Sequence, residues 1–138
     1  GDVVLDPFMG LGTTTIAAII NERNSVGYEI DLLLKPLLKD ILNSTDISQA
    51  NVFLYNRYKK HLDFVEERIK QKKEVKYDNE KLNCKVMTGQ ETNLAFHYLK
   101  SITLQKDNDE LSFETSYFLD RKIEDMPPTE QGSLFFSE

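Results

Sequence analysis

The residues best suited to chemistry lie within the first thirty positions, in a glycine-rich segment followed by an acid. The segment reads Asp6-Pro-Phe-Met-Gly10-Leu-Gly12-Thr-Thr14, and Glu29 follows seventeen residues after Gly12. Glycines at positions 10 and 12 allow the backbone to turn sharply and to approach a ligand that a side chain would exclude. In nucleotide-binding folds, an acid about 20 residues after such a turn accepts hydrogen bonds from ribose hydroxyls. The spacing therefore predicts a site for a nucleoside-containing ligand.

Three kinds of ligand compete for such a site. A P-loop for nucleoside triphosphates requires Gly-Lys followed by Ser or Thr, which the chain lacks. The dinucleotide fingerprint requires a third Gly or Ala where this chain has Thr15. An adenosyl ligand without a pyrophosphate, namely S-adenosylmethionine, remains, although the spacing alone does not decide for it. A purely structural reading also stays open, in which the glycines only make a tight turn and Glu29 is a solvated strand end.

The glycine-rich segment closely resembles the cofactor-binding motif D-P-F-x-G-S/T-G-T-T of DNA amino-methyltransferases, with Leu11 in place of the usual Ser or Thr. Gly27-Tyr-Glu-Ile-Asp31 resembles the next motif of that family, whose acid holds the ribose while its neighbours flank the adenine. The resemblance covers about the first 31 residues and implies S-adenosylmethionine as cofactor. The cofactor-binding residues that it implies are Asp6, Pro7, Phe8, Gly10, Gly12, Thr13, Thr14, Glu29 and Ile30.

The catalytic motif of that family, a polar residue followed by Pro-Pro and an aromatic residue, has no counterpart in this sequence. The segment Met126-Pro-Pro-Thr129 contains the only Pro-Pro pair and lacks both the polar leader and the aromatic ring. In the circularly permuted β class the catalytic motif precedes the glycine motif. The resemblance therefore implies the C-terminal part of a β-class enzyme, which methylates an exocyclic amino group of cytosine or adenine in double-stranded DNA, with this chain inactive alone.

The sequence leaves two alternatives to a DNA amino-methyltransferase open. Some RNA-modifying enzymes carry a similar Asp-Pro-x-x-Gly-x-Gly motif, so an RNA or small-molecule methyltransferase is one rival. A non-catalytic module, either truncated or tethered to a sliding clamp, is the other.

The elements around the glycine segment predict a βαβ unit. Residues 2–6 are apolar and β-branched, as in a strand buried on both faces of a parallel sheet. A buried helix over 14–21, with Thr13 or Thr14 as its N-cap, and a second strand over 25–30 complete the unit, whose crossover should be right-handed. The expected fold class is α/β, a partial Rossmann-like methyltransferase sheet with an additional long helix and a small β segment.

The rest of the chain predicts two further helices and a few strands. A short helix over 31–43 tolerates Pro36 only in its first turn. A longer helix should begin at the capping-box-like pair Asp46 and Gln49 and bury the apolar stripe Ile47, Leu54, Tyr58, Leu62, Val65 and Ile69. Candidate strands lie at 81–88, 99–105 and 111–119, with Lys106 to Asp109 as the turn between the last two.

Composition limits the class of protein. A chain of 138 residues that is 40% hydrophobic can bury one modest core, so we expect a fragment of one domain, with a cofactor-binding portion over 1–122 and a flexible acidic tail over 123–138. The chain has no apolar run near the ~18 residues of a membrane span and no leader-like start, which predicts a cytoplasmic protein. The single Cys84, with His61 and His97, shows no metal-ligand spacing, and no metal is expected.

A basic segment and an apolar segment near the end of the chain each suggest a binding partner. Between Arg57 and Lys76 there are eight Lys or Arg and four acids, a strip that could either contact phosphates or form an ordinary solvated face. Near the end, Gln131-Gly-Ser-Leu-Phe135 resembles the Q-L-S/D-L-F peptide that binds the bacterial sliding clamp, in which Gln131, Leu134 and Phe135 would make the contacts. Its alternative is an apolar end that folds back onto the core.

Overall fold

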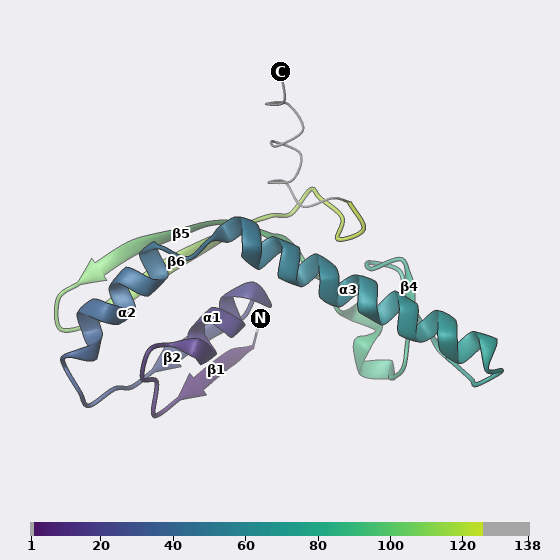
Figure 1. Cartoon of the computed structure of the whole chain (residues 1–138), viewed down its shortest axis with the longest axis horizontal. Helices are drawn as coiled ribbons and strands as arrows, with labels where there is room; N and C mark the ends of the chain where they lie inside the picture. Colours follow the sequence, from purple (N-terminus) through teal and green to yellow (C-terminus); the bar gives the residue numbers. More distant parts are fainter. Residues whose placement is uncertain (1, 126–138) are drawn as a thin grey trace, which may run out of the picture. The chain divides into compact units, whose positions relative to one another are not determined.

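The computed structural model describes residues 2–125 (Figure 1). The sequence suggested one cofactor-binding portion over 1–122, whereas the chain packs as two compact units. The first unit contains Gly1–Ala50 and Leu99–Phe118, and the second contains Asn51–Tyr98 and Leu119–Glu138. Helices and small sheets occur together, so the predicted α/β class is confirmed at that level.

The first unit begins with the predicted βαβ arrangement. Strands β1 (Val3–Asp6) and β2 (Asn24–Gly27) pair in parallel, with Val3 opposite Asn24 and Asp6 opposite Gly27. Helix α1 (Thr13–Ile20) connects the two strands and packs on both of them (Figure 1). The βαβ prediction is therefore confirmed, although the second strand ends at Gly27 rather than at Ile30.

Two details of this unit were predicted wrongly. Residues Val3 and Leu5 are 62% and 63% exposed, so β1 is not buried on both faces, because no other strand among residues 2–125 pairs with the β1 and β2 sheet. The N-cap of α1 is Gly12, in a left-handed conformation with φ of 76°, and not Thr13 or Thr14. A glycine adopts this conformation without the steric cost that a threonine would have.

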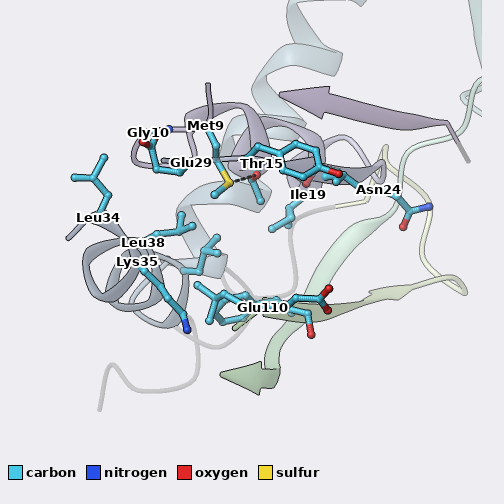
Figure 2. Close-up of a pocket in the computed structure, with 18 of the residues that line it drawn as sticks. Met9, Gly10, Thr15, Ile19, Asn24, Glu29, Leu34, Lys35, Leu38 and Glu110 are labelled. Carbon is cyan, nitrogen blue, oxygen red and sulfur yellow. Dashed lines mark hydrogen bonds between the residues drawn. The ribbon is translucent and has the colours of Figure 1, made fainter. Parts of the chain in front are cut away.

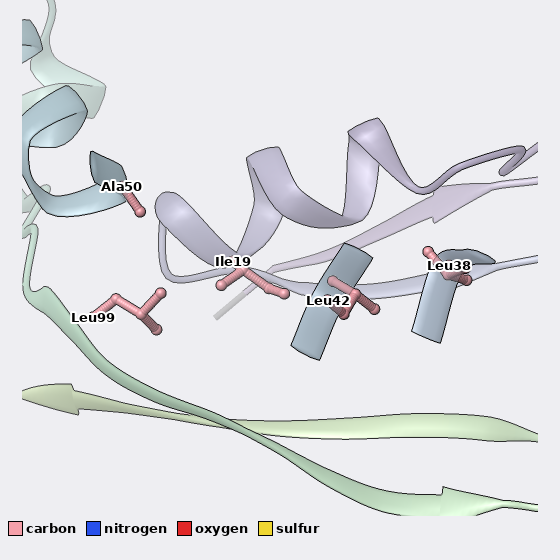
Figure 3. Packing of buried hydrophobic residues seen from close by; sticks show 5 residues of the cluster. All are labelled: Ile19, Leu38, Leu42, Ala50 and Leu99. Atoms are coloured by element: carbon pink, nitrogen blue, oxygen red, sulfur yellow. The ribbon is translucent and has the colours of Figure 1, made fainter. Parts of the chain in front are cut away.

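Helix α2 (Leu34–Asn43) supplies much of the core of the first unit. Its third residue is Pro36, so the proline lies in the first turn as predicted, where its missing N–H costs nothing. The buried residues of this core are Ile19, Leu38, Leu42, Ala50 and Leu99 (Figure 3). They come from α1, α2, the start of α3 and β5, so the core ties the βαβ unit to later parts of the chain.

Strands β5 (Tyr98–Asp107) and β6 (Leu111–Phe118) form the predicted hairpin. Its turn is held to α2 because both Lys35 and Lys39 pair with the Asp107 carboxylate, and Lys35 also donates to the carbonyl of Asn108. Salt bridges with Lys39 and Lys35 keep the pKa of Asp107 below its usual range. On the other side, the Tyr117 hydroxyl donates to the Ile19 carbonyl at 2.8 Å. The hairpin is thus attached to both helices of the first unit.

We expect Tyr117→Phe to lower the free energy of unfolding by about 1 kcal/mol, the usual net value of one intramolecular hydrogen bond. The loss is limited because the Ile19 carbonyl also accepts the backbone N–H of Glu22. Thermal unfolding measures the effect. Tyr28→Phe is the matched control, since the Tyr28 side chain is 63% exposed in the same unit. An equal loss in both variants would contradict a specific role for the Tyr117 hydroxyl.

The second unit is built on the long helix α3 (Ile47–Lys70), most of which belongs to it. The Asp46 carboxylate accepts the N–H of Gln49 at 3.1 Å, which confirms the N-cap half of the predicted capping box. The predicted apolar stripe is buried at Leu54, Tyr58 and Val65. It is wrong at Ile69, which is 55% exposed near the helix end.

A small β segment packs in the second unit, with β3 (Tyr77–Asn79) and β4 (Cys84–Val86) antiparallel, followed by the short helix η1 (Gly89–Asn93). The sequence predicted a single strand over 81–88, and residues 80–83 form the turn instead. The Asn79 side chain is 1% exposed, donates to the carbonyls of Glu91 and Leu94, and accepts the N–H of Leu82. This one amide therefore organises the segment.

The packed chain extends past the expected tail boundary at residue 122. Ile123 is 2% exposed, and the carbonyls of Ile123 and Asp125 accept the Tyr98 hydroxyl at 2.8 and 2.6 Å. The rest of the expected tail, including Met126-Pro-Pro-Thr129 and the clamp-like Gln131, Leu134 and Phe135, lies outside the described residues. Among residues 2–125 the structure contains no helix with the length and apolar character that crossing a membrane requires.

Candidate functional site

The two glycines of the loop after β1 have different surroundings. Both have positive φ, 53° at Gly10 and 76° at Gly12. A Cβ atom at Gly12 would lie 2.4 Å from the Leu38 side chain, whereas a Cβ at Gly10 would meet no atom within 4 Å. A side chain at Gly12 would therefore displace the Leu38 side chain of α2, whereas Gly10 leaves open space beside the loop.

Backbone pairing beyond the ends of the strands positions Glu29 beside this loop. The N–H of Tyr28 donates to the Asp6 carbonyl, and the Tyr28 carbonyl accepts the N–H of Met9, both at 2.9 Å. Close packing supports the pairing, because a Cβ at Gly27 would lie 2.2 Å from the Met9 sulfur. The segment after β2 is thus fixed against the segment after β1, and the next residue, Glu29, faces Gly10.

The Glu29 carboxylate is held by backbone N–H groups on both of its oxygens. Oε2 accepts the N–H of Gly10 and Oε1 accepts the N–H of Asp31, both at 2.8 Å. These bonds, that of Asp31 first, lower the pKa of Glu29 below its ordinary value of 4.5, so the group is ionised at neutral pH. A carboxylate has about four acceptor positions in total, so Glu29 keeps acceptor capacity for a ligand hydroxyl.

A cavity of about 650 Å³ in the first unit borders this arrangement (Figure 2). Gly10 and Glu29 are the predicted site residues that line it. Its wall also contains Met9 and Thr15, whose hydroxyl lies 3.9 Å from the Met9 sulfur. Cavities of roughly 300–1,000 Å³ are typical of small-molecule sites.

The other predicted cofactor-binding residues lie around the loop but outside this cavity. The Asp6 carboxylate accepts the N–H of Phe8 at 3.1 Å and so shapes the turn. The side chains of Phe8 and Ile30 are 88% and 96% exposed, Pro7 and Thr13 are exposed, and Thr14 is the second residue of α1. Phe8 follows β1 and Ile30 follows β2, close in sequence to Gly10 and Glu29. Neither residue lines the cavity, so their part in ligand binding stays a prediction.

Sequence reasoning missed the cavity walls that come from distant segments. Leu34, Lys35 and Leu38 of α2 line the cavity, as do Glu110 and neighbouring residues of the β5–β6 hairpin (Figure 2). The spacing of Leu34, Leu38 and Leu42 predicts an apolar helix face, but it does not indicate what that face meets. Nothing in the sequence indicated that the hairpin lines this cavity, because the hairpin follows the glycine loop by about ninety residues.

Comparison with known sequences agrees with this geometry. Residues 1–40, which contain the loop, Glu29 and the start of α2, match the family described as DNA methylase. The chain is 38% identical over 109 residues to the type II methyltransferase M.MthZI of Methanothermobacter thermautotrophicus. This alignment covers 79% of the chain and 29% of the relative. Over these residues the chain is therefore similar to DNA methylases.

A second relative is similar over a shorter stretch of the chain. The type II methyltransferase M.MjaI of Methanocaldococcus jannaschii is 62% identical over 40 residues, which cover 29% of the chain and 13% of that protein. The chain thus spans less than a third of the length of either methyltransferase relative. The alignment with M.MthZI extends well past the first 40 residues, so the later segments resemble that methyltransferase as well. No solved structure matches the chain.

Proposed function

We propose that this chain supplies the S-adenosylmethionine-binding part of a DNA amino-methyltransferase. The observation that carries the proposal is the Glu29 carboxylate, which is held beside the open face of Gly10 and keeps acceptor capacity on its two oxygens. Such a pair of acceptors suits the two hydroxyls of a ribose. The DNA methylase match over residues 1–40 supports a methyl donor as the ligand.

Glu29, Gly10 and Gly12 each have a part in this proposal. Glu29 accepts the ribose hydroxyls, and the open space at Gly10 admits the ligand to the backbone. Gly12 maintains the contact between α1 and α2 that holds the loop in place. When bound, S-adenosylmethionine would supply an activated methyl group for transfer to an exocyclic amino group of cytosine or adenine. The β1–α1–β2 unit would then be part of a Rossmann-like methyltransferase sheet.

The base that receives the methyl group is expected to bind elsewhere in the methyltransferase. No polar-Pro-Pro-aromatic segment occurs in these 138 residues. Enzymes of this kind reach their target by flipping a base out of the duplex into a pocket. The placement of that pocket before the glycine motif, as in the β class, stays a prediction, as does contact with a sliding clamp.

Isothermal titration calorimetry of the full chain with S-adenosylmethionine tests the proposal. We expect one ligand per chain, competition by adenosine, and no competition by 2′,3′-dideoxyadenosine, which lacks both ribose hydroxyls. Equal competition by the two nucleosides would contradict the role of Glu29. Absence of any binding would contradict the function itself.

The affinity for S-adenosylmethionine should not change between pH 5 and 8 through Glu29. The folded-state pKa of Glu29 is lowered by the N–H groups of Asp31 and Gly10, so the carboxylate stays ionised throughout that range. Protonation removes an acceptor, and affinity should therefore fall only as the pH drops below the ordinary value of 4.5. Titrations at several pH values check this, and a decline centred between pH 6 and 7 would contradict it.

A further inference from the structure

One face of α3 carries two cations and two aromatic rings that have no part in the proposed cofactor site. Phe53, Arg57, Lys60 and Phe64 follow one another at intervals of four, three and four residues, so they share one side of the helix. Phe53 is 57% exposed and Phe64 is 46% exposed, and Arg57 and Lys60 are exposed as well. We refer to these four residues as the α3 basic face.

The charge around this face is positive although the chain as a whole carries −6. Between Asn51 and Tyr98 there are ten Lys or Arg and seven Asp or Glu. Gly1–Ala50 contains only three Lys or Arg and also has seven Asp or Glu. No acid occurs on α3 before Asp63. Among residues 2–125, Lys60 makes no ion pair, and the Arg57 guanidinium lies 6.0 Å from the centre of the Phe96 ring. Lys60 therefore presents its charge to solvent, and Arg57 is exposed beside it.

We propose that the α3 basic face binds the phosphate backbone of duplex DNA. Contact with another protein fits the exposed rings but not the lysine, since lysine is depleted at protein interfaces. A polyanion suits Arg57 and Lys60, because each cation placed on a phosphate releases a condensed counterion. Phe53 and Phe64 lie about 16 Å apart along the helix, at 1.5 Å per residue, and can cover the apolar sugar surfaces on both sides of the phosphate contacts.

Binding at this face would position DNA without reading its sequence, because phosphate contacts carry no sequence information. The inference rests on the proposed function in taking DNA as the partner. It adds a binding surface in the second unit, where neither the glycine loop nor Glu29 lies.

The test compares adjacent lysines of the same helix. Lys60→Gln removes one charge from the α3 basic face, and Lys59→Gln removes one charge about 100° away around the helix. Lys59 is also exposed and makes no ion pair among the described residues. Fluorescence anisotropy of the full chain with a labelled duplex, at several salt concentrations, measures both. We expect Lys60→Gln to weaken binding about fivefold at low salt and to reduce the salt slope by about 0.9, with Lys59→Gln within twofold of the unchanged chain.

The rings are tested separately. Phe53→Gln should weaken DNA binding while leaving the salt slope unchanged, because no phosphate contact is lost. Equal effects of Lys59→Gln and Lys60→Gln would show that bulk charge alone attracts DNA, and the proposal would be overturned. So would absence of DNA binding, or self-association of the chain that Phe53→Gln abolishes without any effect on DNA.

A titration with S-adenosylmethionine separates this inference from the proposed function. Lys60→Gln and Phe53→Gln should bind the cofactor as the unchanged chain does, because both residues lie outside the cofactor site. Cofactor binding without face-specific DNA binding would overturn only the inference. If the unchanged chain did not bind S-adenosylmethionine, the proposed function would be overturned.

Discussion

Glu29→Gln is expected to lower the affinity for S-adenosylmethionine on the order of 100-fold. Both carboxylate oxygens accept a backbone N–H, from Gly10 and from Asp31. A glutamine has one oxygen, so its NH₂ group would face one of these N–H donors and the side chain would leave its position. The ribose would also lose its charged acceptor, and hydrogen bonds to charged groups contribute about 1.5–3 kcal/mol each. Calorimetric titration measures the change.

Asp40→Asn is the matched control for Glu29→Gln. It removes one negative charge from an exposed position on α2 in the same unit and should leave the affinity within about twofold. If both substitutions weakened binding alike, the general negative charge of the unit would be responsible, and the specific role of Glu29 would be wrong. Unchanged affinity in Glu29→Gln would have the same consequence.

The paired substitutions Gly12→Ala and Gly10→Ala should separate stability from binding. Both force a side chain into a left-handed backbone conformation, which costs about 1–2 kcal/mol. At Gly12 the added methyl would also lie 2.4 Å from the Leu38 side chain, which is 5% exposed in the core. Overpacking of this kind costs about 1–3 kcal/mol. We expect Gly12→Ala to lose about 2–4 kcal/mol of unfolding free energy, and Gly10→Ala about 1 kcal/mol.

The order of the two glycines should reverse when ligand binding is measured. The methyl group of Gly10→Ala projects into open space beside the loop, where the ligand is proposed to approach, and should lower the affinity for S-adenosylmethionine about tenfold. Differential scanning calorimetry gives the stabilities and titration gives the affinities. If Gly10→Ala destabilised the chain more than Gly12→Ala, or bound the ligand normally, the separate roles assigned to the two glycines would be wrong.

The local sequence pattern was sufficient to predict the first helices and strands and to indicate the family of the glycine loop. The apolar segments on either side of Gly10 and Gly12 predicted β1, α1 and β2 in their observed order. The loop motif pointed to the DNA methylase family that residues 1–40 match. These features depend on residues close in sequence, whose propensities and spacing are sufficient to indicate structure.

The local sequence pattern gave wrong predictions where a cap or the burial of a side chain depended on tertiary contacts. Threonines after a loop are good N-caps, but the N-cap of α1 is one residue earlier, at Gly12, where the backbone takes a left-handed φ of 76° that favours glycine. The β-branched residues of β1 indicated a buried strand, yet burial is a property of neighbours, and Val3 remains exposed. Ile69 has the spacing of the α3 stripe and is exposed for the same reason.

By itself, the sequence determined that a glycine loop and an acid follow two parallel strands, since that needs only strand and turn propensity. The tertiary structure decided that the Glu29 carboxylate accepts the N–H of Gly10, because the pairing of Tyr28 with Asp6 and Met9 joins segments twenty residues apart. It also decided that α2 and the β5–β6 hairpin form the cavity walls. Such contacts depend on how distant segments pack, and local propensity carries no information about that.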